Sequence, residues 1–316
     1  MIRLIARRLV AVIPTLLIVT FGVFLLVKLV PTDPAVTAAG GTNATQEDIA
    51  RTRRELHLDD SLPSQYLRWL EGAVQGDLGD SYTRKTPVVD EIEQRVPVTM
   101  GLIIAATLFA LLIAVPLGVV SGLRPSGAVD RASRLFASMA VAIPSFVLAQ
   151  LLVVVFAVQL KWLPPSGYVK FSESPSDWLE YIALPAIALG VAIAAAITRQ
   201  LRGALVDELD TNHIRTSWAI GGGRGRVVGL HGLKNAAIPA ITIVGLQVAA
   251  LVGGTVIVEQ IFAMPGIGNY LLGAIISADL PAIQGCVLVL VLVAIAMSLV
   301  VDILYALLNP KVRVAG

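Results

Sequence analysis

Residues 212–239, NHIRTSWAIGGGRGRVVGLHGLKNAAIP, form a polar interruption in a chain otherwise dominated by apolar runs. The first part has the pattern of a short helix: Asn212 is a residue type that caps helices, Ile214 and Trp218 share one face, and Gly221 can supply the left-handed residue that ends it. A helix of about two turns is not stable alone in water, where roughly 12 to 15 residues are needed. The rest of the chain or a partner must therefore support it.

The composition around this stretch defines a class of protein. Hydrophobic residues make up 56% of the chain and charged residues 15%, and the mean hydropathy is +0.80. These values are far from those of soluble domains. The single Cys286 excludes an intramolecular disulfide, and His57, His213 and His231 are too widely spaced for a Cys/His metal cluster. We interpret the chain as an all-α integral membrane protein.

Apolar runs predict six transmembrane helices. About 20 helical residues cross a hydrocarbon core of roughly 30 Å. The runs are 9–30, 101–120, 135–160, 182–197, 238–258 and 287–308. A cleaved signal peptide is the alternative for the first run, since three arginines precede it, but the run is longer than the usual ~7 to 15 apolar residues.

The distribution of Lys and Arg predicts the orientation. Basic residues gather near the N-terminus, at 124–134, at 199–234 and near the C-terminus, whereas the short loops on the other side hold only Lys161 and Lys170. Because short cytoplasmic loops are enriched in Lys and Arg, we expect both termini and the 212–239 stretch to be cytoplasmic, with the chain in the plasma membrane.

The predicted spans divide the chain into three parts. Residues 1–30 form an N-terminal transmembrane helix, residues 31–98 an extracytoplasmic lid segment rich in acidic residues, and residues 99–316 a five-helix core. Within the lid, 46–57 has helix-forming character, and Tyr66 and Trp69 lie at helical spacing, where core packing or an interfacial anchor is the simpler interpretation than ligand contact.

Several residues within the predicted spans affect packing. Prolines lie in or beside them as hinges or static kinks, two readings that the sequence leaves open: Pro116, Pro144, Pro185 and Pro239. Gly118 and Gly122 form a small-xxx-small pair that permits close helix packing. Asp302 is the one ionisable residue near a span interior, and we expect it to reach the interface or a neighbouring helix.

Missing motifs exclude several functions. The glycines at 221–225 lack the GxxxxGK[ST] pattern of a phosphate-binding loop, and HExxH and GxSxG are absent, so we predict no catalytic residue, bound cofactor or metal. The scarcity of intramembrane charges and inverted repeats argues against a secondary transporter. Energy for transport must then enter from a partner, and the short helix suits a groove on that partner, with Ile214 and Trp218 as apolar contacts. A membrane-embedded sensor or scaffold is the remaining alternative.

Specific motifs carry a family resemblance. RTSWAIGGG at 215–223, followed by KNAAIP at 234–239, resembles the EAA loop of ABC importer permeases, and Gly221, Asn235 and Pro239 match its spacing. PTDPA at 31–35, LHLDDSLPSQYLRWL at 56–70, GDLGDSYTRKTPVVDEIEQRVPVT at 76–99 and VEQIFAMPGIGNYL at 258–271 extend the resemblance over nearly the whole chain. Together these segments resemble the first of the two permease subunits of the dipeptide and oligopeptide uptake family.

The resemblance implies a type I ABC importer permease fold, with a cytoplasmic coupling loop at 200–235. It implies a heterodimer with a second homologous permease, one or two cytoplasmic ABC ATPase subunits that use ATP and Mg, an extracytoplasmic peptide-binding protein and a lipid bilayer, but no nucleic acid. Related importers carry nickel or glutathione, so the substrate stays open between these and peptides.

The resemblance also implies two sets of site residues. The first would couple the chain to the ATPase: His213, Ile214, Arg215, Thr216, Ser217, Trp218, Ala219, Gly221, Asn235 and Pro239. The second is a candidate outer gate or docking element, with a plain re-entrant turn as the alternative: Glu259, Phe262, Pro265 and Gly266.

Overall fold

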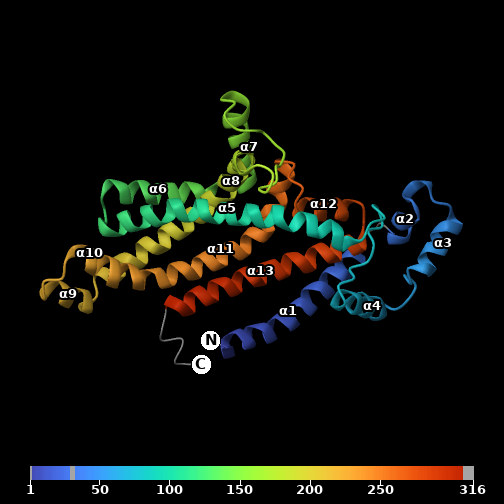
Figure 1. Ribbon diagram of the computed structural model, residues 1–316, viewed down its shortest axis with the longest axis horizontal. Helices are drawn as coiled ribbons and strands as arrows, with labels where there is room; N and C mark the ends of the chain where they lie inside the picture. The colour runs from blue at the N-terminus through green and yellow to red at the C-terminus, as the bar shows by residue number, and fades with distance from the viewer. Residues whose placement is uncertain (1, 29–32, 309–316) are drawn as a thin grey trace. The chain divides into compact units, whose positions relative to one another are not determined.

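The computed structural model describes residues 2–28 and 33–308, and this part of the chain is helical (Figure 1). Its one β pairing among those residues is an isolated bridge between Asp80 and Pro87. The N-terminal and lid helices are α1 (Ile2–Lys28), α2 (Pro34–Ala39), the 3-10 turn η1 (Gly41–Asn43), α3 (Gln46–Glu55) and α4 (Leu62–Val74). The remaining elements are α5 (Val88–Leu123), α6 (Ala128–Ala142), α7 (Ser145–Leu152), the π-helix η2 (Val153–Gln159), α8 (Pro175–Leu209), α9 (Asn212–Ala219), α10 (Arg224–Arg226), the π-helix η3 (Val227–Leu233), α11 (Lys234–Ile261), α12 (Ile267–Ile276) and α13 (Leu280–Leu308).

Four helical segments among the described residues are long and apolar enough to cross a membrane: Val88–Leu123, Pro175–Leu209, Val227–Ile261 and Leu280–Tyr305. The number is five if α6 and the α7–η2 segment count as one broken span. In α1, the apolar part Val12–Leu26 is shorter than these segments. The prediction of an all-helical, multi-pass membrane protein is therefore confirmed, and the helices extend beyond most of the predicted apolar runs.

The predicted span at 135–160 is present as a bent pair of helices and not as one continuous helix. The helix breaks between Ala142 and Ser145, and its two halves are bent by 101°. Pro144 is the physical reason, because a proline ring disfavours helical geometry at the preceding residue, and Ile143 is extended with φ −94° and ψ 116°. Pro144 is then the N-cap residue of α7, a position where a missing N–H costs the helix no hydrogen bond. By contrast, Pro116, Pro185 and Pro239 lie inside continuous helices.

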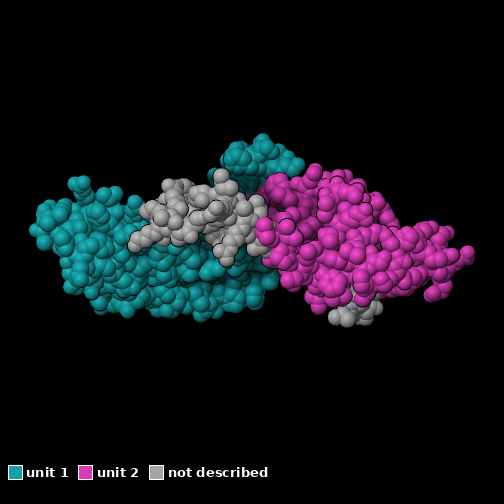
Figure 2. Space-filling view, turned by 90° about the horizontal axis from the view of Figure 1, so that it is seen from below, with its two compact units in different colours: residues 1–6, 101–263, 294–316 teal, residues 7–100, 264–293 magenta. Residues whose placement is uncertain are grey.

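The described structure divides into two compact units, shown in teal and magenta in Figure 2. Unit 1 comprises residues 1–6, 101–263 and 294–316. In this unit α8 packs against α6, α7 and α11, and a buried core forms around Leu201, Leu205, Ala236 and Ala240. A core that ties α8 to α11 positions both ends of the intervening 212–239 loop.

The small-xxx-small pair packs as predicted. A Cβ atom built on Gly118 would lie 3.1 Å from side-chain atoms of Leu201, and one on Gly122 would lie 3.0 Å from those of Leu205. Both distances are tighter than an ordinary Cβ contact. The two glycines therefore allow α5 to approach α8 closely within unit 1.

Unit 2 comprises residues 7–100 and 264–293. The predicted lid helices are present as α3, which starts with a Thr45–Asp48 capping box, and α4. The Tyr66 hydroxyl lies 2.8 Å from the Thr20 hydroxyl, and its ring packs against Phe21 and Phe24, so Tyr66 is a core residue. This confirms the simpler interpretation of Tyr66.

An acidic side chain fixes the segment that joins α4 to α5 in unit 2. The Asp279 carboxylate accepts hydrogen bonds from the Ser81 hydroxyl at 2.5 Å and from the backbone N–H groups of Tyr82 and Thr83 at 3.1 Å each. Burial and the nearby Asp279 carboxylate together raise the pKa of Tyr82 to about 12, so its phenol is neutral at physiological pH.

Candidate functional site

The short helix predicted within 212–239 is α9. It starts one residue earlier than expected, because Thr211 is the N-cap residue and Asn212 is already helical. The Thr211 side chain does not cap α9 but donates a 2.6 Å hydrogen bond to the carbonyl of Glu208. Thr211 therefore holds the turn between α8 and α9, and the predicted capping role of Asn212 is wrong, because Thr211 occupies the N-cap position.

The C-terminal end of α9 is a Schellman motif. The N–H of Gly221 bonds to the carbonyl of Trp218 at 3.0 Å, and the N–H of Gly222 bonds to the carbonyl of Ser217 at 3.0 Å. Gly221 has φ +83°, which confirms the predicted left-handed residue. Gly222 is required for lack of space, since a Cβ atom at this position would lie 2.6 Å from the Ser217 oxygen.

The two apolar residues on α9 have different surroundings. Ile214 is 0% exposed, whereas Trp218 is 41% exposed and the following Ile220 is more exposed still. Since α9 contacts α8 and η3, the Ile214 side chain is buried inside this chain. The expectation that Ile214 is an exposed contact is therefore corrected: Ile214 anchors α9 within this chain, and Trp218 is an exposed apolar side chain of the helix.

Glu208, near the end of α8, joins three helices. Its Oε1 atom lies 3.0 Å from His213 Nε2 on α9 and accepts a 2.7 Å hydrogen bond from Asn235 Nδ2 on α11. Because the backbone carbonyl of Glu208 also accepts from Thr211, this one residue holds the start of α9 at two points. Sequence reasoning missed Glu208, although it identified both His213 and Asn235.

The other predicted residues of α9 face outward. Arg215 and Asp210 pair at 2.6 Å, but both side chains are well exposed, and such pairs contribute little to stability. The hydroxyls of Thr216 and Ser217 donate to carbonyls one turn back, and Ala219 is exposed. The exposed surface of α9 thus combines polar side chains with the apolar Trp218 and Ala219.

Pro239 lies in the second turn of α11. A proline at this position cannot donate to the carbonyl four residues earlier, which belongs to Asn235. The preceding residues 227–233 are π-helical, so the segment that leads from α9 into α11 departs twice from regular α-helix. Asn235 is thus affected at two of its groups. Its side chain donates to Glu208, and its backbone carbonyl receives no helical hydrogen bond from Pro239.

The candidate outer gate residues are divided between the two units. Glu259 and Phe262 belong to unit 1, where both are buried and the Phe262 carbonyl accepts a 2.8 Å hydrogen bond from the N–H of Gly167. Pro265 and Gly266 belong to unit 2, where Pro265 is exposed and Gly266 is the N-cap of α12. Phe262 is thus held through its backbone carbonyl.

A second acidic residue missed by sequence reasoning is Asp130, at the start of α6. Its buried carboxylate pairs with Arg202 of α8 through two hydrogen bonds of 2.8 and 3.1 Å, and with Arg134 at 3.4 Å. The sequence reading used Arg131 and Arg134 only as markers of orientation. The side chain of Asp302 lies outside the described residues.

The fold and this loop define the class of protein, a multi-pass helical protein of the inner membrane. The family described as binding-protein-dependent transport system inner membrane component matches residues 114–314, and the N-terminal membrane component of the same systems matches residues 1–103. The chain belongs to this family and is a membrane permease component of a transport system.

Relatives match the chain from end to end. A probable peptide ABC transporter permease protein of Sinorhizobium fredii is 34% identical over 309 residues, which cover 98% of each chain. A glutathione transport system permease protein of Pectobacterium atrosepticum is 41% identical over 307 residues, which cover 97% of each chain. Both are similar to this chain in length as well as in sequence.

Proposed function

We propose that this chain is one of two different membrane permease subunits of an ATP-driven peptide importer, and that α9 is the helix that couples it to a cytoplasmic ABC ATPase. The observation that carries the proposal is the construction of α9. A helix too short to persist alone is braced by Glu208 at its start, by buried Ile214 in its middle and by two glycines at its end, while Trp218 is left exposed.

The bracing suggests how force would pass through the chain. Glu208 lies on α8 and binds residues of both α9 and α11, so a displacement of α9 would move the cytoplasmic ends of two long helices together. The π-helical η3 and Pro239 would absorb the local change in helix geometry. The buried contacts between α8 and α11 around Leu201, Leu205, Ala236 and Ala240 would carry the displacement into the core of unit 1.

The proposed topology has six spans, with α1 as the first and both termini in the cytoplasm. The excess of Lys and Arg on one set of loops supports this orientation. The residues between α1 and α5 would then lie on the extracytoplasmic side, where a binding protein delivers substrate. ATP and Mg would be bound by the ATPase subunits and not by this chain.

The segment from Glu259 to Gly266 would act at the outer end of the path. Its support is the burial of Glu259 and Phe262 at the end of α11, followed by a Pro-Gly turn. We expect Glu259→Ala to lower substrate-stimulated ATP hydrolysis and uptake. Unaltered values of both in the assembled complex would leave only the interpretation of a plain turn.

Peptides are the proposed substrates because one full-length relative is named a peptide permease, and the glutathione named for the other is itself a peptide derivative. The test is ATPase and uptake measurement on the complete complex in proteoliposomes, with its binding protein and a panel of dipeptides, longer peptides, glutathione and nickel. We expect stimulation by peptides. Stimulation by nickel alone would overturn the peptide assignment, and purification without a second permease and an ATPase would overturn the importer assignment.

A further inference from the structure

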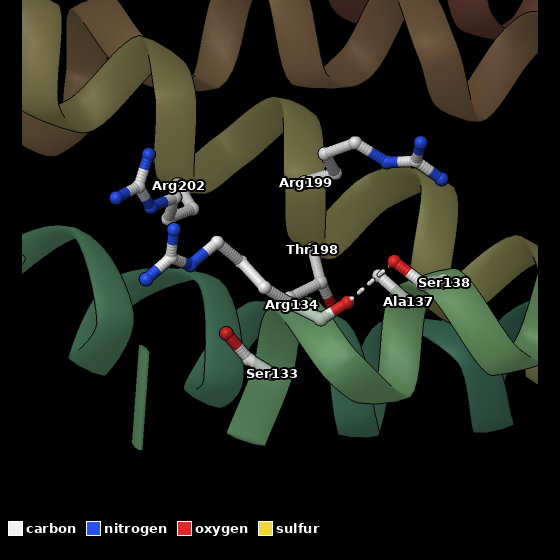
Figure 3. Close-up of a pocket in the computed structure, with 7 residues that line it drawn as sticks. All are labelled: Ser133, Arg134, Ala137, Ser138, Thr198, Arg199 and Arg202. Atoms are coloured by element: carbon white, nitrogen blue, oxygen red, sulfur yellow. Dashed lines mark hydrogen bonds between the residues drawn. The ribbon is translucent and has the colours of Figure 1, made fainter. Parts of the chain in front are cut away.

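A cavity lined by arginine and hydroxyl-bearing residues lies between α6 and α8 in unit 1, apart from the coupling loop. Its volume is about 240 Å³. Figure 3 shows its lining residues, with Thr198 near the centre, Arg134 and Arg202 close together on one side, and Arg199 extending to the other. Three arginines and three hydroxyl-bearing residues thus contribute to the lining of this cavity.

The charge around this cavity is not balanced. Arg202 and Arg134 share one carboxylate, that of Asp130, and no acidic partner lies within ion-pair distance of Arg199 among the described residues. Three arginines thus line the cavity, and only two of them pair with the Asp130 carboxylate among the described residues. Such an arrangement favours binding of an anion, which guanidinium groups recognise with paired hydrogen bonds.

A buried hydroxyl points to the same conclusion. Thr198 is 1% exposed, and its Oγ1 atom has no hydrogen-bond partner in the described structure. Buried polar groups in native proteins are nearly always satisfied, so an orphan hydroxyl at a cavity wall indicates a missing acceptor or donor. The oxygen atoms of a bound phosphate would supply it.

The surroundings favour a lipid over a soluble anion. Leu135 and Met139 directly follow the cavity residues Arg134 and Ser138 on α6, and both are largely exposed. Arg199 lies ten residues before the end of α8, a rise of about 15 Å at ~1.5 Å per residue. The cavity thus lies close to exposed apolar residues of α6, and two of its three arginines belong to the C-terminal third of α8; basic pockets between membrane helices bind anionic headgroups.

We infer that this cavity binds the phosphate of an anionic phospholipid, such as phosphatidylglycerol, with Arg199, Arg134 and Thr198 as its ligands. The lipid chains would run along the exposed apolar residues of α6. Arg202 is a positioning residue, because Asp130 holds it in place. The inference rests on the orientation proposed above and is independent of the transported substrate.

The test is a titration of the purified complex in neutral detergent with phosphatidylglycerol or phosphatidylcholine, with bound lipid counted by native mass spectrometry. Arg199→Gln should weaken phosphatidylglycerol binding about fivefold, as expected for one basic residue at an anionic surface. Arg131→Gln is the matched control. Arg131, on α6, is an exposed arginine like Arg199 on α8, but it does not line the cavity. Its affinity should equal that of the wild type.

Thr198→Val separates the site from a packing role. It removes the hydroxyl at nearly constant volume, so it should weaken phosphatidylglycerol binding without lowering the unfolding temperature in detergent. Equal losses in the Arg131 and Arg199 variants would overturn the inference in favour of diffuse surface charge. Unchanged binding in both the Arg199 and Thr198 variants would overturn it outright, and displacement of the lipid by equimolar inorganic phosphate would replace the lipid by a soluble anion.

Discussion

At the scale of single residues, two adjacent glycines end α9 for different physical reasons. Gly221 adopts φ +83°, where a side chain is strained by its own backbone, and a Cβ there would meet no other atom within 4 Å. Gly222 has an ordinary φ, but a Cβ there would collide with the Ser217 oxygen. The end of the helix therefore depends on backbone freedom at one position and on empty space at the next.

We expect Gly221→Val to lower substrate-stimulated ATP hydrolysis and uptake. The left-handed conformation costs an L-residue about 1–2 kcal/mol, and a β-branched side chain resists it further, so α9 would lose its Schellman end. Gly223→Ala is the matched control, because Gly223 has neither a positive φ nor a neighbour within 4 Å of its Cβ position. A Gly221→Val complex that assembles and imports at the wild-type rate would contradict the assignment of α9.

Glu208→Ala should loosen α9 from both long helices. The change removes the contacts with His213 and Asn235, and hydrogen bonds to a charged group contribute roughly 1.5–3 kcal/mol each when buried and less at this partly exposed position. The measurement is the rate of limited proteolysis between α8 and η3. Asp207→Ala, an exposed neighbour, serves as the control; equal cleavage rates in the two variants would exclude the bracing role.

At the scale of helices, the contact of α5 with α8 depends on missing side chains. Gly122→Val should destabilise the protein by about 1–3 kcal/mol, the usual cost of overpacking, because its Cβ would lie 3.0 Å from Leu205. Gly203→Val on α8 is the matched control, since its Cβ would meet nothing within 4 Å. Thermal unfolding in one detergent compares them, and a Gly122 variant as stable as the Gly203 variant would refute this packing.

The sequence predicted helices well where hydrophobic length alone defines them. The 101–120, 182–197, 238–258 and 287–308 runs all lie inside helices, and the Gly118–Gly122 spacing correctly predicted close packing. It failed at Pro144, because a proline inside an apolar run is compatible with either a kink or a complete break. The extended Ile143 shows that the backbone took the second course.

The candidate site was predictable only in part for a similar reason. Gly221 follows from a local rule about helix ends, so the sequence sufficed. Glu208 is separated by 27 residues from Asn235, and their contact depends on how the intervening turns and the π-helix bring the chain back. Asp130 and Arg202 are 72 residues apart, so no local pattern connects them.

At the scale of the whole molecule, the proposed orientation predicts which loops face the cytoplasm. The proposed topology places Trp162 and Trp218 on opposite sides of the membrane. Both side chains are exposed, so a single cysteine at either position can be labelled in a variant that lacks the buried Cys286. We expect a membrane-impermeant maleimide added to intact cells to label Trp162→Cys and not Trp218→Cys. Labelling of both variants before lysis would refute the topology, and labelling of Trp218→Cys alone would reverse it.

The exposed indole of α9 also provides an optical reporter of assembly. Fluorescence of a tryptophan shifts to shorter wavelength when its ring leaves water. In a chain whose other three tryptophans are replaced by phenylalanine, the emission of Trp218 should shift to the blue when the ATPase binds, and the shift should follow the nucleotide cycle. An emission spectrum that does not change on assembly would show that the partner leaves this face of α9 uncovered.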